Sequence, residues 1–344
     1  TTLFRSMALK ELDNKNIIAK AITPTHGEIL AKLGAFKIIY PERESARKLV
    51  ENLVGNVVID QVLTTVVQGF VLAENVGRYL FPTVPVTRSG GKVVMFTERD
   101  FIVYQTQRAK GSNTKRIDIG YEGQPYALEL HSLEGKVPRE DLRDAEQTAP
   151  SIKLGVRAVN KAMRGIMLPL EVQQANIARD PNNYPASNKV AMSGTSQWTD
   201  PSSNPVGDIE KGKEVIRQSC GTDPNTLVLS PAAFKALKDH PAIAKRLTIT
   251  ADGKAITAAM LADLFEIDNV VVGKAVKWDD IENKVVDVWG NDAVLAYTPT
   301  AAELDKEMPA FGYTYSMEGH PYAEPNYYDN NAKTYFYPVT HERV

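Results

Sequence analysis

The sequence contains little cysteine, almost no net charge and no long apolar run. Its one cysteine, Cys220, excludes a disulfide within the chain and a cysteine-based zinc cluster, and it fits a reducing compartment. Forty basic residues balance forty-two acidic ones, so the formal net charge of -2 gives no overall attraction to nucleic acid or to an anionic membrane. No stretch approaches the roughly 20 apolar residues that span a bilayer, and no signal peptide is recognisable. We expect synthesis in the cytoplasm and no membrane partner.

Chemically reactive side chains are present, but not in the pattern of a catalytic or metal site. The residues that could supply a nucleophile, a base and an acid are His131, His240, His320, Asp239 and Cys220. No sharp turn such as G-x-S-x-G surrounds Cys220 or any serine, so we interpret these five residues as structural. A group of carboxylates that lacks the D-x-D-x-D-G order of a calcium loop comprises Asp279, Asp280, Glu282 and Asp287. We expect these to lie in a solvated turn, and we expect no enzyme, metal or cofactor.

Residues 7–56 carry a helix, strand, helix rhythm that differs from the rest of the chain. A helix is predicted over 26–33, a short apolar strand over 36–40 and an amphipathic helix over 43–54. The string AKAITPTHGEILAKLGAFKIIYPERESARKLVENLV resembles the end of the nucleotide-binding regulatory (RCK or TrkA-N) domain of potassium channels and potassium-uptake systems. This resemblance, over residues 8–54, implies a truncated Rossmann-like fragment. No G-x-G-x-x-G motif precedes Val57 to cradle a dinucleotide phosphate, so we assign no nucleotide-binding residue.

The first six residues, TTLFRS, match the translated end of a sequencing adapter. Residues 1–6 are therefore expected to be an adapter-derived leader, with Met7 as the first natural residue. We hypothesise a chimera in which the regulatory-domain fragment is joined to a second gene between Gly55 and Gln61. The alternative is a helical extension native to the rest of the chain. An alternative function, drawn from the fragment alone, is a nucleotide-gated regulatory subunit of a potassium transporter.

Residues 57–134 are predicted to form an arm and a long hairpin. The arm, over 57–90, lacks one clean apolar period and ends at Pro82 and Pro85, which should stop regular pairing. Alternating strands over 92–104 and 115–121 then flank the turn RAKGSNTK. The basic residues of the hairpin tip are Arg108, Lys110, Lys115 and Arg116. An isolated hairpin is marginal in water and the tip has no aromatic side chain for base stacking, so we interpret these four residues as contacts between subunits.

Apolar side chains recur every three or four residues over 151–179, which predicts one long amphipathic helix. Pro169 removes a backbone hydrogen bond inside it at a cost of about 3 kcal/mol, so a kink or a break is expected there. Residues 180–206 are rich in Pro, Asn, Ser and Gly and are expected to form a loop. A compact α/β unit follows, with helices predicted over 207–218, 231–247 and 257–265 and strands over 226–229, 270–277 and 285–297. A half-buried sheet or a subunit interface is expected for the closing aromatic residues Phe311, Tyr313, Tyr315, Tyr322, Tyr327, Tyr328, Tyr335, Phe336 and Tyr337.

Several strings resemble the major capsid proteins of tailed phages, in the lambda gpE-like group. They are VLTTVVQGFVLAENVGRYLFPTVPV, DPNTLVLSPAAFKALKDHP, LADLFEIDNVVVGKAV and VWGNDAVLAY. The resemblance covers residues 57–344 and implies an α+β fold of the Hong Kong 97 phage type. Its parts would be an N-terminal arm (57–90), an extended hairpin or E-loop (91–134), a peripheral domain with the spine helix (135–205 and 300–344) and an axial domain (206–299).

The same resemblance implies a structural subunit of an icosahedral capsid, located in the virion. The implied partners are copies of the chain in pentamers and hexamers, a scaffolding protein, portal and cementing proteins, and packaged DNA through non-specific contacts. Members of the family usually run on beyond residue 344, so the chain is expected to be cut at its C-terminus.

Overall fold

The computed structural model describes residues 18–20, 37–39, 59–94, 106–108, 110, 113–114, 116, 123–148, 153–247, 256–299 and 310–344. The chain divides into two compact units, residues 1–61 and 62–344. In the first unit, β1 (Ile18–Lys20) pairs in parallel with β2 (Lys37–Ile39). β2 confirms the strand predicted over 36–40, whereas β1 is not among the predicted elements. The helices predicted over 26–33 and 43–54 lie outside the described residues.

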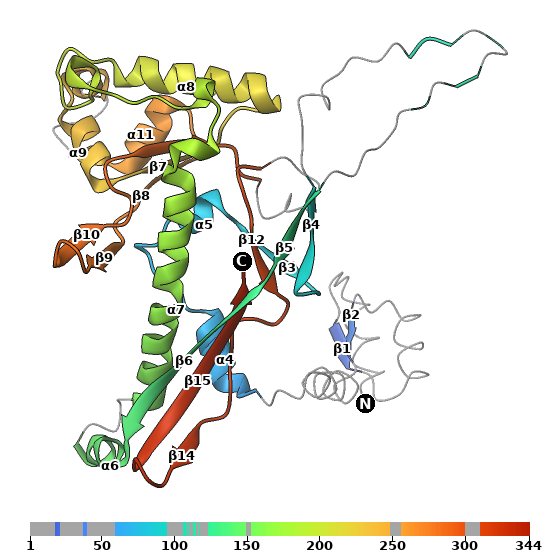
Figure 1. Ribbon diagram of the computed structural model, residues 1–344, viewed down its shortest axis with the longest axis vertical. Coiled ribbons are helices and arrows are strands. Elements are labelled where there is room, and N and C mark those ends of the chain that lie inside the picture. Colours follow the sequence, from blue (N-terminus) through green and yellow to red (C-terminus); the bar gives the residue numbers. More distant parts are fainter. Residues whose placement is uncertain are drawn as a thin grey trace, which may run out of the picture. The chain divides into compact units, whose positions relative to one another are not determined.

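The second unit contains a six-stranded sheet built around β15 (Thr334–Arg343). β15 pairs over its whole length with antiparallel β6 (Glu129–Pro138), from Thr334 opposite Pro138 to Arg343 opposite Glu129 (Figure 1). Three short strands pair with its other edge: β14 (Tyr327–Asp329), β13 (Tyr322–Ala323) and β12 (Thr314–Met317). β12 in turn pairs in parallel with β3 (Thr83–Val86), which continues the sheet. The strands predicted at the aromatic end of the chain are confirmed, and β15 has a partner on each edge.

Helix α7 (Leu154–Arg179) packs along β6 and β15 and confirms the predicted long helix (Figure 1). The buried core between helix and sheet consists of Leu63, Val67, Val137, Ala158, Val159, Ala162, Met163, Ile166, Ala323, Tyr337 and Val339. The backbones of β6 and α7 approach closely at Gly135, where a Cβ atom would overlap the carbonyl group of Ala158. Pro169 lies inside α7, which is helical on both sides of it, so the chain does not break there. A bend at Pro169 stays a prediction.

The arm contains more regular structure than predicted. α4 (Gln61–Gln68) buries Leu63, Thr64 and Val67, a helical spacing, and the Thr64 hydroxyl both donates to the Ala323 carbonyl and accepts from the Ala323 N–H. α5 (Gly77–Leu80) follows. The expectation that Pro85 stops pairing is wrong, because Pro85 lies within β3, opposite Ser316 of β12. β3 ends the path of strands in this sheet, and a proline is tolerated in an edge strand because it need not donate to a further neighbour.

The base of the predicted hairpin is a two-stranded ribbon. β4 (Gly90–Val94) pairs antiparallel with β5 (Gly123–Ala127), and most of the chain between them lies outside the described residues. Tyr126 of β5 stacks on Tyr315 of β12, with ring centroids 4.6 Å apart. After β6, helix α6 (Arg139–Thr148) precedes α7. Neither β6 nor α6 is among the predicted elements.

Residues 205–296 form the expected α/β unit around a three-stranded sheet. The central strand β7 (Thr226–Leu229), buried at every residue, pairs in parallel with β8 (Asn269–Val272) and antiparallel with β11 (Ala293–Ala296). The helices around it are α8 (Pro205–Cys220), α9 (Pro231–Asp239), α10 (Pro241–Leu247) and α11 (Ala258–Phe265). Before this unit, the predicted loop contains only three short 3-10 helices, Pro181–Asn183, Ala186–Asn188 and Gly194–Ser196.

Three predicted elements of this unit are each divided in the structure. The helix predicted over 231–247 becomes α9 and α10 because Pro241 cannot continue the helix before it. The strand predicted over 270–277 becomes β8 and β9 (Val276–Asp279), and the strand over 285–297 becomes β10 (Lys284–Asp287) and β11. β9 and β10 pair only with each other among the described strands. No helix within the described ranges has the length and apolar character needed to cross a bilayer.

Candidate assembly interface

Glu171 of α7 joins the arm, the long helix and the α/β unit at one buried carboxylate. Its side chain is 1% exposed, and its Oε1 accepts hydrogen bonds from the Val76 N–H at 2.9 Å and from the indole N–H of Trp289 at 2.7 Å. Its Oε2 accepts from the Gly77 N–H at 3.0 Å. Burial raises the pKa of Glu171, while these three donors act in the opposite direction. The carboxylate therefore satisfies the N-terminus of α5 and fixes the segment after β10 against α7.

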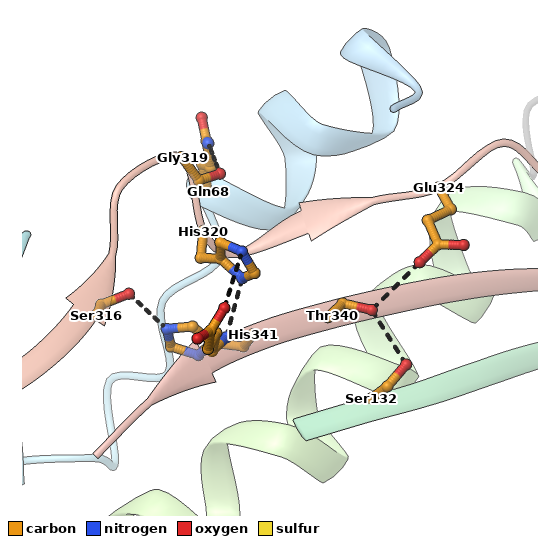
Figure 2. Close-up of polar contacts among 9 residues, drawn as sticks. Gln68, Ser132, Ser316, Gly319, His320, Glu324, Thr340 and His341 are labelled. Carbon is orange, nitrogen blue, oxygen red and sulfur yellow. Dashed lines mark hydrogen bonds and ion pairs between the residues drawn. The ribbon is translucent and has the colours of Figure 1, made fainter. Parts of the chain in front are cut away.

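A second polar cluster holds the end of β15 within the sheet (Figure 2). His341 lies opposite His131 of β6, and its Nε2 is 3.1 Å from the Ser316 hydroxyl of β12. His320 accepts a hydrogen bond at Nδ1 from the Glu342 N–H, at 2.9 Å. Burial, with the positive charge of Arg343 adding to it, lowers the pKa of His341 to about 3. Burial also lowers the pKa values of His131 and His320, so all three imidazoles are neutral at pH 7.

Arg343 is the last residue of β15 and is buried against α7. Its guanidinium donates to the Ile166 carbonyl at 3.2 Å and to the Gln173 side chain at 3.5 Å. Burial lowers the pKa of Arg343 to about 10, which still leaves it protonated at pH 7. Arg343 and Glu171 therefore connect separate elements of the second unit through buried polar contacts.

The residues considered for catalysis are used structurally. His240 is buried between α9 and α10, where Nδ1 accepts from the Ala242 N–H at 3.2 Å and Nε2 lies 3.2 Å from the Ser203 hydroxyl. Cys220 ends α8 and its thiol faces the Thr222 carbonyl at 3.3 Å. His131 lies in β6 and His320 in the connection between β12 and β13, so the structure does not bring the five candidates together. Within the residues that the structure describes, no group of three His, Cys, Asp or Glu side chains could hold a metal ion.

Asp279, Asp280 and Glu282 lie at the β9–β10 turn, as expected, whereas Asp287 is the last residue of β10, opposite Val276. The Asp279 side chain accepts from the backbone N–H groups of Ile281 and Glu282, at 2.8 and 3.1 Å. These hydrogen bonds lower the pKa of Asp279 and shape the turn. The group is therefore a turn motif on the surface.

The predicted contact residues of the hairpin tip are surface residues where they are described. Arg108, Lys110 and Arg116 are exposed, and Lys115 lies outside the described residues. Their role between subunits stays a prediction.

An exposed apolar surface, which sequence reasoning missed, lies on β9 and β10. Val285 stands directly opposite Trp278, and both side chains are more than half exposed, at 58% and 57%. Val276 lies two residues before Trp278 on the same face of the strand, and Ile281 occupies the turn. The alternation V-K-W in β9 was the available signal, but the surrounding carboxylates favoured a solvated turn.

Comparisons with known proteins agree on the second unit. Residues 161–328 match the family Phage major capsid protein E. The major capsid protein of Burkholderia phage BcepMu is 35% identical over 268 residues, which are 77% of this chain and 85% of that protein. The crystal structure of a phage-related protein from Bordetella bronchiseptica RB50 is 42% identical and has a TM-score of 0.71, covering 84% of this chain and 93% of that one.

The first unit has a different similarity. The Ktr system potassium uptake protein C of Bacillus subtilis is 37% identical over 59 residues, which are 17% of this chain and 27% of that protein. This confirms the resemblance of the N-terminal string to a potassium-uptake regulator. Because the match spans about a quarter of that protein, it carries none of its activity to this chain.

The chain is 35% and 42% identical to these two proteins and covers 85% and 93% of their lengths. The second unit has the order of elements that the resemblance implies, from arm and hairpin to long helix and α/β unit. The predicted α+β capsid fold of the Hong Kong 97 phage type is confirmed. The chain belongs to the phage major capsid protein E family and is the major capsid protein of a tailed phage, a structural protein of the virion that assembles into shells with copies of itself and not an enzyme.

Proposed function

We propose that this capsid subunit forms pentamers and hexamers of an icosahedral shell, together with a scaffolding protein, around packaged DNA. We further propose that the basic hairpin tip of one copy contacts an acidic surface of a neighbouring copy. The observation that carries this contact is the exposure of Arg108, Lys110 and Arg116, which lie in the sequence between the two strands of the β4–β5 ribbon. Such a ribbon is marginal in water unless another layer covers it.

The charge balance of the chain supports a copy of itself as the partner of the tip. Residues 106–116 contain four basic residues and no acidic one. Removing these four charges from the net of -2 leaves -6 for the rest of the chain. A neighbouring copy therefore offers negative charge, and complementary charges of this kind mainly raise the rate and specificity of association.

The shell proposal is tested by producing the full chain with and without the scaffolding protein of its source. Sedimentation and electron microscopy should show closed shells of uniform size when both proteins are present. Particles without five-fold and six-fold clusters, or a chain that stays monomeric with its scaffold, would contradict the proposal.

The tip contact is tested by reversing two charges in Lys110→Glu with Arg116→Glu. Assembly should slow at least tenfold, and its dependence on salt concentration should weaken, because the attraction that steers association is lost. The matched control reverses two exposed lysines of the α/β unit, Lys211→Glu with Lys235→Glu, for the same change in net charge. Equal effects of the two pairs would mean that net charge, and not the tip, controls assembly.

We also propose that residues 7–56 come from a second gene. The boundary between the two compact units follows Gln61, next to the junction expected between Gly55 and Gln61, and this supports the proposal. Sequencing across that junction in DNA freshly amplified from the source tests it. One continuous reading frame from Met7 into the capsid region would refute a chimera.

A further inference from the structure

The β9–β10 hairpin carries an apolar face with no cover in the described structure. Four large hydrophobic side chains within residues 276–287 are exposed. Their exposed fractions are 47% for Val276, 57% for Trp278, 95% for Ile281 and 58% for Val285. The register places Trp278 against Val285 across the ribbon, and Val276 lies on the same face. In Figure 1 the hairpin projects from the α/β unit on the side away from α8. An exposed apolar patch on the order of a few hundred Å² commonly marks an interaction site.

We propose that this apolar face packs against a neighbouring copy of the same chain, a contact that rests on the assembly of the chain into shells. A second copy fits better than a nucleic acid, because residues 276–287 carry four acidic residues and two lysines, and net negative charge repels phosphates. The hairpin belongs to the α/β unit, so this contact is separate from the basic tip. Around a five-fold or six-fold axis the contact is heterologous, with the hairpin of each copy meeting a different surface of the next.

The size of the patch also favours a repeated contact in a shell over an independent pair. A stable binary interface buries roughly 800 Å² on each partner, and the hairpin face supplies only part of that area. One such contact is weak alone. Within a ring of copies, however, the contact that closes the ring forms between subunits already held together, so it acts at a high effective concentration. Trp278 is the expected anchor, because an aromatic side chain buries more apolar area than its neighbours and tryptophan is enriched at the energetic centres of interfaces.

The experiment compares Trp278→Gln combined with Val285→Thr against a control on the other face of the same ribbon, Lys277→Ser. The double variant should need at least a tenfold higher concentration to sediment as assemblies, while the control assembles as wild type does. Both should unfold at the wild-type urea midpoint, because the changed apolar side chains are exposed in the single subunit. A shifted midpoint in the double variant would place these residues in the subunit's own core and refute the proposal.

A second readout follows the three tryptophans during assembly of the unchanged chain. Trp289 is buried and Trp198 is partly buried with its indole N–H bound to Asp208, so Trp278 should dominate quenching by acrylamide in the free subunit. Assembly should lower this quenching and shift the emission to the blue. Assembled shells in which quenching is unchanged would refute the hairpin contact while leaving self-assembly intact, whereas a chain that never assembles would refute both.

Discussion

Replacing Glu171 by alanine should strongly destabilise the subunit, because this carboxylate is 1% exposed and holds together three parts of the second unit. The substitution removes the acceptor of three buried donors, the N–H groups of Val76 and Gly77 and the indole N–H of Trp289. Each buried donor without a partner costs about 1–3 kcal/mol. Part of this loss is offset, because burial of the carboxylate is itself unfavourable, as its raised pKa indicates. We expect a net loss of about 3–5 kcal/mol in the free energy of unfolding.

Glu171→Gln is the matched control, since it keeps the shape of the side chain. An amide oxygen placed where Oε1 lies would still accept from Val76 and Trp289, and only the hydrogen bond from Gly77 to Oε2 would be lost. The expected loss is about 1–2 kcal/mol, mainly from the amide N–H group facing the Gly77 N–H. Urea unfolding of the dissociated subunit measures both variants, and Trp289 emission reports directly on the site. If Glu171→Ala stays within 1 kcal/mol of wild type, or Glu171→Gln is as harmful as alanine, the three hydrogen bonds do not hold this joint.

Three further changes test other parts of the structure. His341 alone should lower the unfolding free energy by up to about 1.4 kcal/mol per pH unit as the pH falls below 6.5, because the unfolded chain gains a proton there that the folded chain, with a pKa of about 3, does not. His341→Gln should remove about this much of the slope in urea titrations, and an unchanged slope would show that other groups control it. Gly135→Ala should lower the free energy of unfolding by about 1–3 kcal/mol, because the added methyl group would overpack β6 against Ala158 of α7. The control is Gly90→Ala, where a Cβ atom meets only ordinary contacts, and its loss should be less than about 1 kcal/mol. Equal shifts in the thermal unfolding midpoint would contradict the close approach at Gly135. Titration of the full chain with NADH or ATP should show no heat of binding, since no Gly-rich phosphate loop precedes Val57, and saturable binding would revive the alternative of a nucleotide-gated regulator.

The elements that could be predicted from the sequence are those whose own residues show the spacing of a helix or the composition of a strand. α7 is recognisable because its apolar residues repeat at helical spacing, and β7 because all four of its residues are apolar or β-branched and buried. β6 was missed because six of its ten residues are exposed, two leucines among them, and its strand conformation comes from ten pairings with β15, far along the chain. Propensity cannot reveal a strand that is formed by a distant partner.

The buried polar residues could not be predicted for a related reason. Glu171 occupies a helix position that would ordinarily face solvent, and only the docking of α5 and Trp289 makes it a buried acceptor. His341 is likewise an unremarkable residue in the sequence until β6 and β12 enclose it. The apolar face at Trp278 could have been predicted as a strand face, because hydrophobic residues alternate with charged ones there. The alternation does not say whether another part of the same chain covers that face.

The position of β15 in the chain has a consequence for synthesis in the host cell. The ribosome delivers β15 after every other strand of the six-stranded sheet, so β6 waits for its partner for on the order of tens of seconds at the usual pace of translation. Until then its edge is open to strands of other nascent chains, which makes chaperone protection valuable. The same delay leaves the unfinished polypeptide without the central strand of this sheet, so the sheet cannot be completed before translation passes β15.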